Sequence, residues 1–349
     1  MSKYLSKKRS ALKPYTPGEQ PRDRRYIKLN TNESPFPPSP KAIELGYEAM
    51  KNEQLYSDPT CKALITAASG VFGVGEDCIL FTNGSDDALN FAFMAFCDEN
   101  HGAAFADITY GFYPVFANLN HVPYTLIPLK DDFSIDIRDY FGIGKTIFIA
   151  NPNAPTGLAL TAGQIEEIVR ANPGNVVVVD EAYTYFGSES CIPLTKKYEN
   201  LLVIGTFSKS RSMAGARLGY AIGCPSLISD LNLIKYSTNP YCINSVTLAM
   251  GVGALSDEEY TKNNCRIVSE NREYTYGELI GMGFFALPSK SNFIFAKHPT
   301  LSGEEVYKYL RERGILVRYL KGERTSAFVR ISVGTRAEME KLVQCLKEI

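Results

Sequence analysis

The feature that most constrains the fold is the alternation of short apolar runs with helical patterns between Pro40 and about Tyr236. Strands that alternate with helices form mostly parallel sheets with helices on both faces. The pattern therefore predicts an α/β fold, in which a mostly parallel seven-stranded sheet is flanked by helices. The expected strands are Ile79–Thr82, Ala103–Ala106, Tyr124–Ile127, Thr146–Ala150, Val176–Asp180, Leu202–Thr206 and Tyr220–Gly223.

Polar residues follow the most apolar of these strands. An unbroken valine run, residues 176–179, leads into Asp180, Glu181 and Tyr183. In α/β folds, ligands bind beyond the carboxyl ends of such buried strands. A carboxylate there can hold a protonated pyridine nitrogen, and Tyr183 can contact a ring hydroxyl. The alternative is that Asp180 caps the next turn and Tyr183 only packs.

A lysine follows another buried run, residues 201–204. Three residues separate this run from Ser208 and Lys209, and Arg217 follows eight residues after Lys209. Partial desolvation favours the neutral amine, which attacks carbonyls to form Schiff bases. Such an amine beside a hydroxyl and a permanent cation suits pyridoxal phosphate. A lysine without this context is usually a solvated surface charge.

A third strand leads into a candidate anion site. Residues 79–82 run into Gly84, Ser85 and Asp86, and a helical pattern continues to Phe96. Free backbone N–H groups and the helix dipole favour a phosphate at such a helix start. Ordinary capping by Ser85 or Asp86 is the alternative.

In this order the motifs resemble the fold-type I pyridoxal-phosphate-dependent aminotransferases of class I/II. Tyr110 and the run Asn151-Pro152-Asn153-Ala154-Pro155-Thr156-Gly157 complete the series. Within that group the chain resembles the histidinol-phosphate aminotransferase family, and the resemblance spans nearly all of it. The narrower matches are Leu29–Pro35, Leu55–Pro59, Asn239–Asn244, Ser291–Phe293, Gly314–Arg318 and Arg330–Thr335.

The resemblance implies a cofactor, pyridoxal 5′-phosphate, and a role for each residue around it. Lys209 carries the cofactor and, once freed by the substrate amine, serves as the general base. Asp180 keeps the ring nitrogen protonated, Tyr183 contacts the ring hydroxyl and Tyr110 stacks on the ring.

The same resemblance implies that the active sites are shared in a homodimer. Tyr56 from the partner subunit is expected to reach the cofactor phosphate. The phosphate-binding residues within one chain are expected to be Gly84, Ser85, Asp86, Ser208 and Arg217.

Substrate choice is expected to depend on arginines. The resemblance places Arg330 where the family binds the α-carboxylate of glutamate. Histidinol phosphate has no carboxylate, so its phosphate must use the same anchor, and a guanidinium fork suits both anions. Arg318 is a second candidate for a phosphate, and Tyr15 is expected to close over the substrate. The alternative for each arginine is a surface ion pair.

These residues predict transamination of L-histidinol phosphate with 2-oxoglutarate, giving imidazole acetol phosphate and L-glutamate in histidine biosynthesis. Related alternatives are a threonine-phosphate decarboxylase and an aromatic amino-acid aminotransferase. A non-catalytic regulator is disfavoured, because the motifs begin near residue 30 and leave no room for a DNA-binding domain. A dinucleotide-dependent dehydrogenase is disfavoured because no Gly-x-Gly-x-x-Gly turn follows an early strand.

The sequence departs from the family pattern at four positions. Ala154 stands where an asparagine amide usually contacts the ring hydroxyl. Tyr183 then makes this contact alone, or Asn153 or a water molecule assists. The other departures are Ser57, Asp87 and Cys242.

The chain is expected to divide into three parts. Residues 1–29 form an N-terminal arm that packs with the small domain and the dimer partner. Residues 30–245 form the large cofactor-binding domain, and residues 246–349 form a smaller α+β domain. Capping-box patterns mark four helix starts, at Thr161/Gln164, Ser256/Glu259, Ser302/Glu305 and Thr335/Glu338.

Composition excludes other classes of partner. The net charge of −1 gives no field for nucleic acid or a membrane surface, and no apolar run is long enough to cross a bilayer. Eight cysteines without a C-x-x-C pair indicate reduced thiols in a cytoplasmic protein, and three scattered histidines predict no metal site. The basic N-terminus lacks an apolar segment, so we expect no secretory signal.

Overall fold

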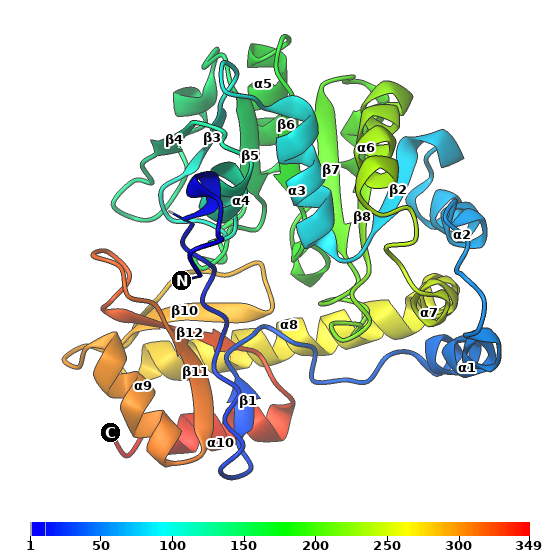
Figure 1. The fold of residues 1–349 in the computed structure, drawn as a ribbon. Coiled ribbons are helices and arrows are strands. Elements are labelled where there is room, and N and C mark those ends of the chain that lie inside the picture. Colours follow the sequence, from blue (N-terminus) through cyan, green and yellow to red (C-terminus); the bar gives the residue numbers. More distant parts are fainter. Residues whose placement is uncertain (1, 11) are drawn as a thin grey trace.

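The computed structural model describes residues 2–10 and 12–349 and contains two sheets, one above the other in Figure 1. We call the part built on the seven-stranded sheet the large lobe. The part built on the five-stranded sheet, with the helices that cover it, is the small lobe. The long helix α8 (Glu258–Gly281) runs along the boundary between them.

The large sheet has the strand order β2-β8-β7-β6-β5-β3-β4. Strand β8 is antiparallel to β2 and β7, and all other neighbours are parallel. The seven expected strands and their mostly parallel arrangement are therefore confirmed. The strands are β2 (Ile79–Thr82), β3 (Ala103–Ala106), β4 (Tyr124–Ile127), β5 (Thr146–Ala150), β6 (Val177–Asp180), β7 (Leu201–Thr206) and β8 (Gly219–Ile222).

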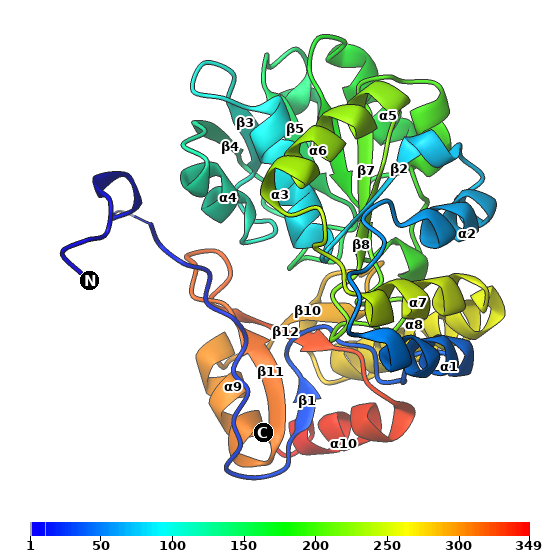
Figure 2. The same cartoon turned by 45° about the vertical axis from the view of Figure 1, so that its right-hand side comes forward.

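Helices cover both faces of this sheet because its central strands are apolar on both sides. Val177 and Val179 pack in a core with α2 and α5, whereas Val178 packs in a core with α3, α4 and α6. Figure 2 shows α3 and α6 in front of the strands. The bounds are α2 (Lys62–Phe72), α3 (Ser85–Phe96), α4 (Tyr113–Leu119), α5 (Ala162–Ala171) and α6 (Pro225–Thr238).

The small sheet has the order β1-β11-β12-β10-β9. Strand β1 pairs in parallel with β11, so the end of the predicted N-terminal arm forms an edge of the small lobe. The elements are β1 (Ile27–Leu29), β9 (Phe285–Ala286), β10 (Phe293–Lys297), β11 (Ile315–Tyr319), β12 (Phe328–Ser332), α9 (Gly303–Glu312) and α10 (Arg336–Leu346).

Two further helices, α1 (Pro40–Ala49) and α7 (Ser245–Leu255), pack together at the side of the large lobe. Helix α7 packs against α1 and α2, which belong with the large lobe. We therefore propose that the small lobe begins after Leu255 rather than at residue 246. Short 3₁₀ turns complete the chain: η1 (Lys7–Arg9), η2 (Met50–Asn52), η3 (Glu76–Cys78), η4 (Ile137–Tyr140), η5 (Thr184–Phe186) and η6 (Ile192–Lys196).

The capping boxes at Thr161, Ser302 and Thr335 are confirmed, each with both reciprocal hydrogen bonds. The predicted box at Ser256 is wrong. Ser256 still has helical backbone angles and ends α7, and its hydroxyl donates to the carbonyl of Gly253. Helix α8 starts after Asp257 without a side-chain cap.

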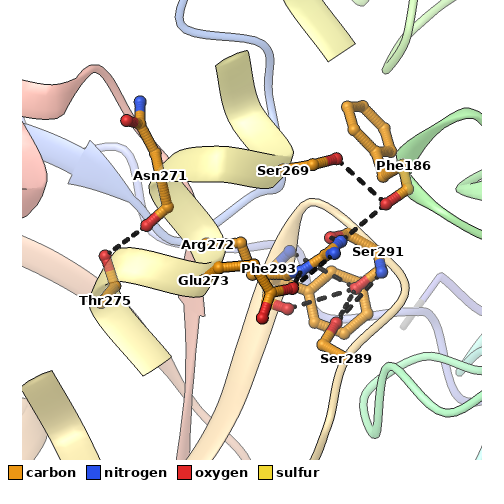
Figure 3. Close-up of polar contacts among 9 residues, drawn as sticks. All are labelled: Phe186, Ser269, Asn271, Arg272, Glu273, Thr275, Ser289, Ser291 and Phe293. Atoms are coloured by element: carbon orange, nitrogen blue, oxygen red, sulfur yellow. Dashed lines mark hydrogen bonds and ion pairs between the residues drawn. The ribbon is translucent and has the colours of Figure 1, made fainter. Parts of the chain in front are cut away.

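A buried arginine of α8 contacts both the turn η5 and the segment before β10 (Figure 3). Arg272 of α8 donates from Nη1 to the carbonyl of Phe186 at 2.7 Å and to the carbonyl of Ser291 at 2.8 Å. Ser269 donates to the same Phe186 carbonyl at 3.0 Å. Helix α8 therefore holds the turn η5, which follows Tyr183. Among the helices of the described residues, none has the length and apolar character of a membrane span.

Candidate active site

A cavity of about 410 Å³ lies where the two lobes meet. Loops after β5, β6 and β7 form one wall, and residues 30–33, Arg318 and Arg330 form the other. The predicted site residues that line it are Tyr15, Ser85, Asp86, Tyr110, Asp180, Tyr183, Ser208, Lys209, Arg217, Arg318 and Arg330. Tyr56 does not belong to this lining.

The start of α3 forms a close-packed cradle. Gly84 is the N-cap residue with φ 82°, and a Cβ there would lie 2.5 Å from Arg217 Nη2. A Cβ at Gly219 would lie 2.2 Å from the backbone nitrogen of Ser85. The capping alternative for Ser85 and Asp86 is wrong, because Ser85 is already helical and no side chain caps α3. The first backbone N–H groups of α3 are therefore without a side-chain cap, as an anion site requires.

Asp86 organises the side chains around this cradle. Arg217 Nη2 lies 3.0 Å from Asp86 Oδ2, and the Tyr110 hydroxyl donates to Asp86 Oδ1 at 2.7 Å. Burial, and then the Asp86 charge, raises the pKa of Tyr110 well above its usual value. Ser208 is buried, and its hydroxyl lies 3.0 Å from that of Thr206. The Asp86 carboxylate thus holds Tyr110 and Arg217, and only its backbone N–H suits an anion.

Asp180 ends β6 and is only 5% exposed. Its carboxylate accepts hydrogen bonds from the Tyr113 hydroxyl at 3.2 Å and from the backbone N–H of Ala182 at 3.1 Å. Burial raises the pKa of Asp180 to about 6. Among the residues that the structure describes, no basic side chain forms an ion pair with it. A buried carboxylate without a cation is suited to hold a protonated ring nitrogen.

Sequence reasoning missed Tyr113. Its ring is fully buried among Phe105, Tyr110 and Phe148, so its aromatic pattern indicates only a core residue. Only the tertiary packing of α4 in the same core as β6 places its hydroxyl on Asp180.

Lys209 lies on the loop between β7 and β8. Its Nζ donates to the carbonyl of Thr31 at 3.1 Å. Burial, and then the nearby Arg330 charge, lowers the pKa of Lys209 to about 8. A useful fraction of this amine is therefore neutral near pH 7, as a nucleophile or a general base requires.

Tyr183 faces Lys209 across the cavity, with its ring centre 6.0 Å from Nζ. Its hydroxyl accepts a hydrogen bond from Asn32 Nδ2 at 3.0 Å. Asn153 does not replace the amide missing at Ala154. Its Nδ2 donates to the Ile108 carbonyl and to Thr156, and its Oδ1 accepts from Thr109.

Two arginines line the opposite wall. Arg330 Nη2 donates to the carbonyl of Asn30 at 3.2 Å, whereas its buried Nε has no partner in the described part of the chain. Arg330 lines the cavity, and the fork of donors in a guanidinium is suited to bind an anion. Arg318 donates to the carbonyl of Thr16 at 2.7 Å, so the N-terminal arm already lies beside it. Tyr15 of this arm stacks on Phe112 at 4.4 Å.

Tyr56 lies away from the cavity of its own chain. It is 85% exposed and stacks on Tyr241 at 4.7 Å. The structure thus brings every predicted site residue except Tyr56 to one place, with Gly84 at the rim beside Arg217.

Comparison with known proteins identifies the family. The chain matches the profile of aminotransferase class I and II over residues 24–346. It is 48% identical over 354 residues to the histidinol-phosphate aminotransferase of Brachyspira hyodysenteriae, covering 100% of this chain and 99% of the relative. The enzyme of the same name from Clostridium botulinum is 44% identical over 350 residues, with coverage of 100% and 99%.

Solved structures agree on the fold. The histidinol-phosphate aminotransferase of Sinorhizobium meliloti, solved in complex with pyridoxal-5′-phosphate, gives a TM-score of 0.89 at 21% identity, covering 100% of this chain and 98% of that one. A putative histidinol-phosphate aminotransferase from Erwinia carotovora atroseptica gives 0.86 at 25% identity, with coverage of 93% and 95%. The chain therefore belongs to the class I and II aminotransferases, has their fold-type I architecture and is a transaminase.

Proposed function

We propose that this transaminase transfers the amino group of L-histidinol phosphate to 2-oxoglutarate, giving imidazole acetol phosphate and L-glutamate in histidine biosynthesis. The observation that carries the proposal is one cavity lined by a lysine of lowered pKa, Lys209, a buried carboxylate, Asp180, and a half-buried arginine, Arg330. Relatives that are 44–48% identical over the full chain carry this activity in their names.

The residues of the cavity fit pyridoxal 5′-phosphate. We assign its covalent attachment to Lys209 and its ring nitrogen to Asp180. We assign the contact with its ring hydroxyl to Tyr183 and stacking on its ring face to Tyr110. The phosphate is assigned to the start of α3 at Gly84, Ser85 and Asp86, with Ser208 and Arg217. When bound, this cofactor supplies an electron sink that stabilises negative charge on the substrate α-carbon.

The protein supplies the proton chemistry. With its lowered pKa, Lys209 can take the proton from the α-carbon of the amino donor on Nζ, and in the second half of the reaction the same Nζ can give a proton to the α-carbon derived from the 2-oxo acid. The buried Asp180 carboxylate would stabilise a protonated ring nitrogen, and the low dielectric of its site would strengthen this contact. The Tyr110 hydroxyl stays protonated and keeps Asp86 in place.

Specificity is assigned to the arginine wall. Arg330 lines the cavity and is proposed to bind the phosphate of one substrate and the carboxylate of the other. Arg318 contacts the N-terminal arm, and Tyr15 belongs to this arm. We propose that the arm closes the cavity over the substrate. Exclusion of water strengthens each of these charge-assisted contacts.

We propose further that the enzyme is a cytoplasmic homodimer. Helix α1 and the segment after it expose large apolar side chains, and such patches mark protein interfaces. All eight cysteines are free, as expected for a reducing compartment. The exposed patch comprises Ile43, Tyr47, Met50, Leu55 and Tyr56.

A half-reaction screen tests this function. Enzyme loaded with pyridoxal phosphate is mixed separately with histidinol phosphate, phenylalanine, tyrosine and threonine phosphate, while absorbance reports conversion of the cofactor to its amine form. We expect the fastest conversion with histidinol phosphate and none with the Lys209→Ala variant. Release of carbon dioxide from threonine phosphate, or faster reaction with an aromatic amino acid, would contradict the proposed substrate.

A further inference from the structure

Asn32 is a buried polar residue beside the reacting groups that the assigned chemistry does not use. It follows β1, is only 1% exposed and lines the cavity. Its Nδ2 donates to the Tyr183 hydroxyl at 3.0 Å, which joins residues 151 positions apart.

The small lobe fixes the orientation of this amide. The Ser332 hydroxyl donates to Asn32 Oδ1 at 2.9 Å and accepts from the Asn32 backbone N–H at 2.8 Å. Asn292 donates to the Asn32 carbonyl at 3.0 Å. Because Ser332 occupies the oxygen side, the amide must present its N–H to Tyr183. Asn32 also has φ 55°, a left-handed conformation that asparagine tolerates better than most residues.

This contact decides where the Tyr183 proton points. A phenol has one proton and can also accept hydrogen bonds. Asn32 donates to the oxygen, so the Tyr183 O–H is left to donate in another direction, toward the cavity. Burial raises the pKa of Tyr183, so the proton is retained at neutral pH. Ala154, on the same wall, offers no side-chain donor, and Asn153 is fully engaged elsewhere.

We propose that Asn32 is a positioning residue that directs the Tyr183 proton at the ring oxygen of the cofactor and strengthens that hydrogen bond. Chains of hydrogen bonds polarise one another, so the donated N–H makes the Tyr183 hydroxyl a better donor. The inference rests on the proposed function and deepens it. It also makes the tuning of Tyr183 depend on the small lobe, because Ser332 and Asn292 hold Asn32.

The test measures the pH at which the visible band of the enzyme-bound cofactor changes. A hydrogen bond to the ring oxygen favours its anionic form and lowers this midpoint. Asn32→Gly keeps the left-handed backbone and removes the amide, so we expect the midpoint to rise by roughly half to one pH unit. Asn32→Asp presents an acceptor that draws the Tyr183 proton away from the cavity, so we expect a rise at least as large.

Two comparisons separate this role from a structural one. In a Tyr183→Phe background, Asn32→Gly should add no further shift, because Asn32 acts through the Tyr183 hydroxyl. The control Asn172→Ala removes an equally buried amide that bonds only to the carbonyls of Tyr140 and Ile168, and it should leave the midpoint unchanged.

Each outcome is decisive. An unchanged midpoint in Asn32→Gly, or a shift that persists in the Tyr183→Phe background, would overturn the inference. If Asn32→Gly fails to fold, Asn32→Ala carries the same comparison, since it also removes the amide and adds no charge. A wild-type enzyme that shows no visible band with pyridoxal phosphate would refute the proposed function instead.

Discussion

At the scale of single residues, the site depends on how its ionisable groups are buried. Lys209 and Arg330 line one cavity, where burial, and then the Arg330 charge, lowers the pKa of Lys209. A pKa of about 8 in the folded chain lies below the ordinary 10.5. The folded protein therefore releases this proton before the unfolded chain does. Below pH 8, the charged Lys209 therefore lowers the stability of the cofactor-free protein. This destabilisation is lost as the pH rises from about 8 to 10.5.

The lowered pKa of Lys209 predicts how cofactor attachment depends on pH. The neutral amine is the attacking form, so the attachment rate should rise about tenfold between pH 7 and pH 9 and then level off. Stopped-flow absorbance with the cofactor-free enzyme measures this rate. Arg330→Met removes the cation that lowers the pKa of Lys209, so its profile should move to higher pH. A wild-type rate that is flat across this range would contradict the assignment.

A second residue-scale prediction concerns the anion anchor. Arg330→Ala should weaken glutamate and histidinol phosphate alike, by roughly 10- to 100-fold in kcat/KM, because one charge-assisted contact is lost for both. Steady-state kinetics in both directions measure the effect. Arg318→Ala is the matched comparison and should affect histidinol phosphate more. If Arg330→Ala impaired only one substrate, the two anions would not share this anchor.

At the scale of elements, the site is assembled from strand ends. Strands β5, β6 and β7 are parallel, so the residues that follow them meet at one edge of the sheet. This arrangement brings Ala154, Asp180 and Lys209 together. The small lobe supplies the other wall, and Arg272 of α8 fixes the turn η5 against it.

The Arg272 contact predicts a large effect on stability. Arg272→Met leaves the buried carbonyls of Phe186 and Ser291 without their donor, so the free energy of unfolding should fall by roughly 2–5 kcal/mol. Urea denaturation measures this change. Arg266→Met on the same helix removes an exposed i,i+4 pair with Glu270 and should change stability by less than about 0.5 kcal/mol. Equal losses of unfolding free energy in the two variants would show that the buried hydrogen bonds of Arg272 stabilise the fold no more than the exposed ion pair of Arg266.

At the scale of the whole molecule, the exposure of Tyr56 is explained if a second subunit covers it. Lys209→Ala and Tyr56→Ala should each be inactive or impaired. In a shared site, Lys209 comes from one subunit and Tyr56 from its partner. Mixed and reassociated in equal amounts, they should recover about a quarter of wild-type activity, because half of the dimers are hybrids with one intact site. Size-exclusion chromatography with activity assays tests this. Recovery no greater than the sum of the separate variants would exclude a shared site.

The sequence predicted the large sheet to within a residue at each strand end. Periodicity and apolar runs report which segments are buried on both faces, and this information is local. Lys209 and Asp180 were singled out because they follow or end apolar strands of the parallel sheet, whereas Arg330, in the other sheet, was placed only by the resemblance to the family. The chemistry of all three stays a prediction. The predicted capping box at Ser256 failed because α7 ends and α8 begins at adjacent residues. The sequence pattern does not show that Ser256 ends the first helix rather than starting the second.

The sequence by itself determined the strands, the helices and the residue types at the strand ends. Only the tertiary structure decided which side chains meet inside the cavity. Asn32 reaches Tyr183 and Ser332, and Tyr113 reaches Asp180, across 67 to 300 positions of sequence. Such contacts depend on how the lobes pack and on the direction of each hydroxyl and amide, and no local pattern of residues encodes either.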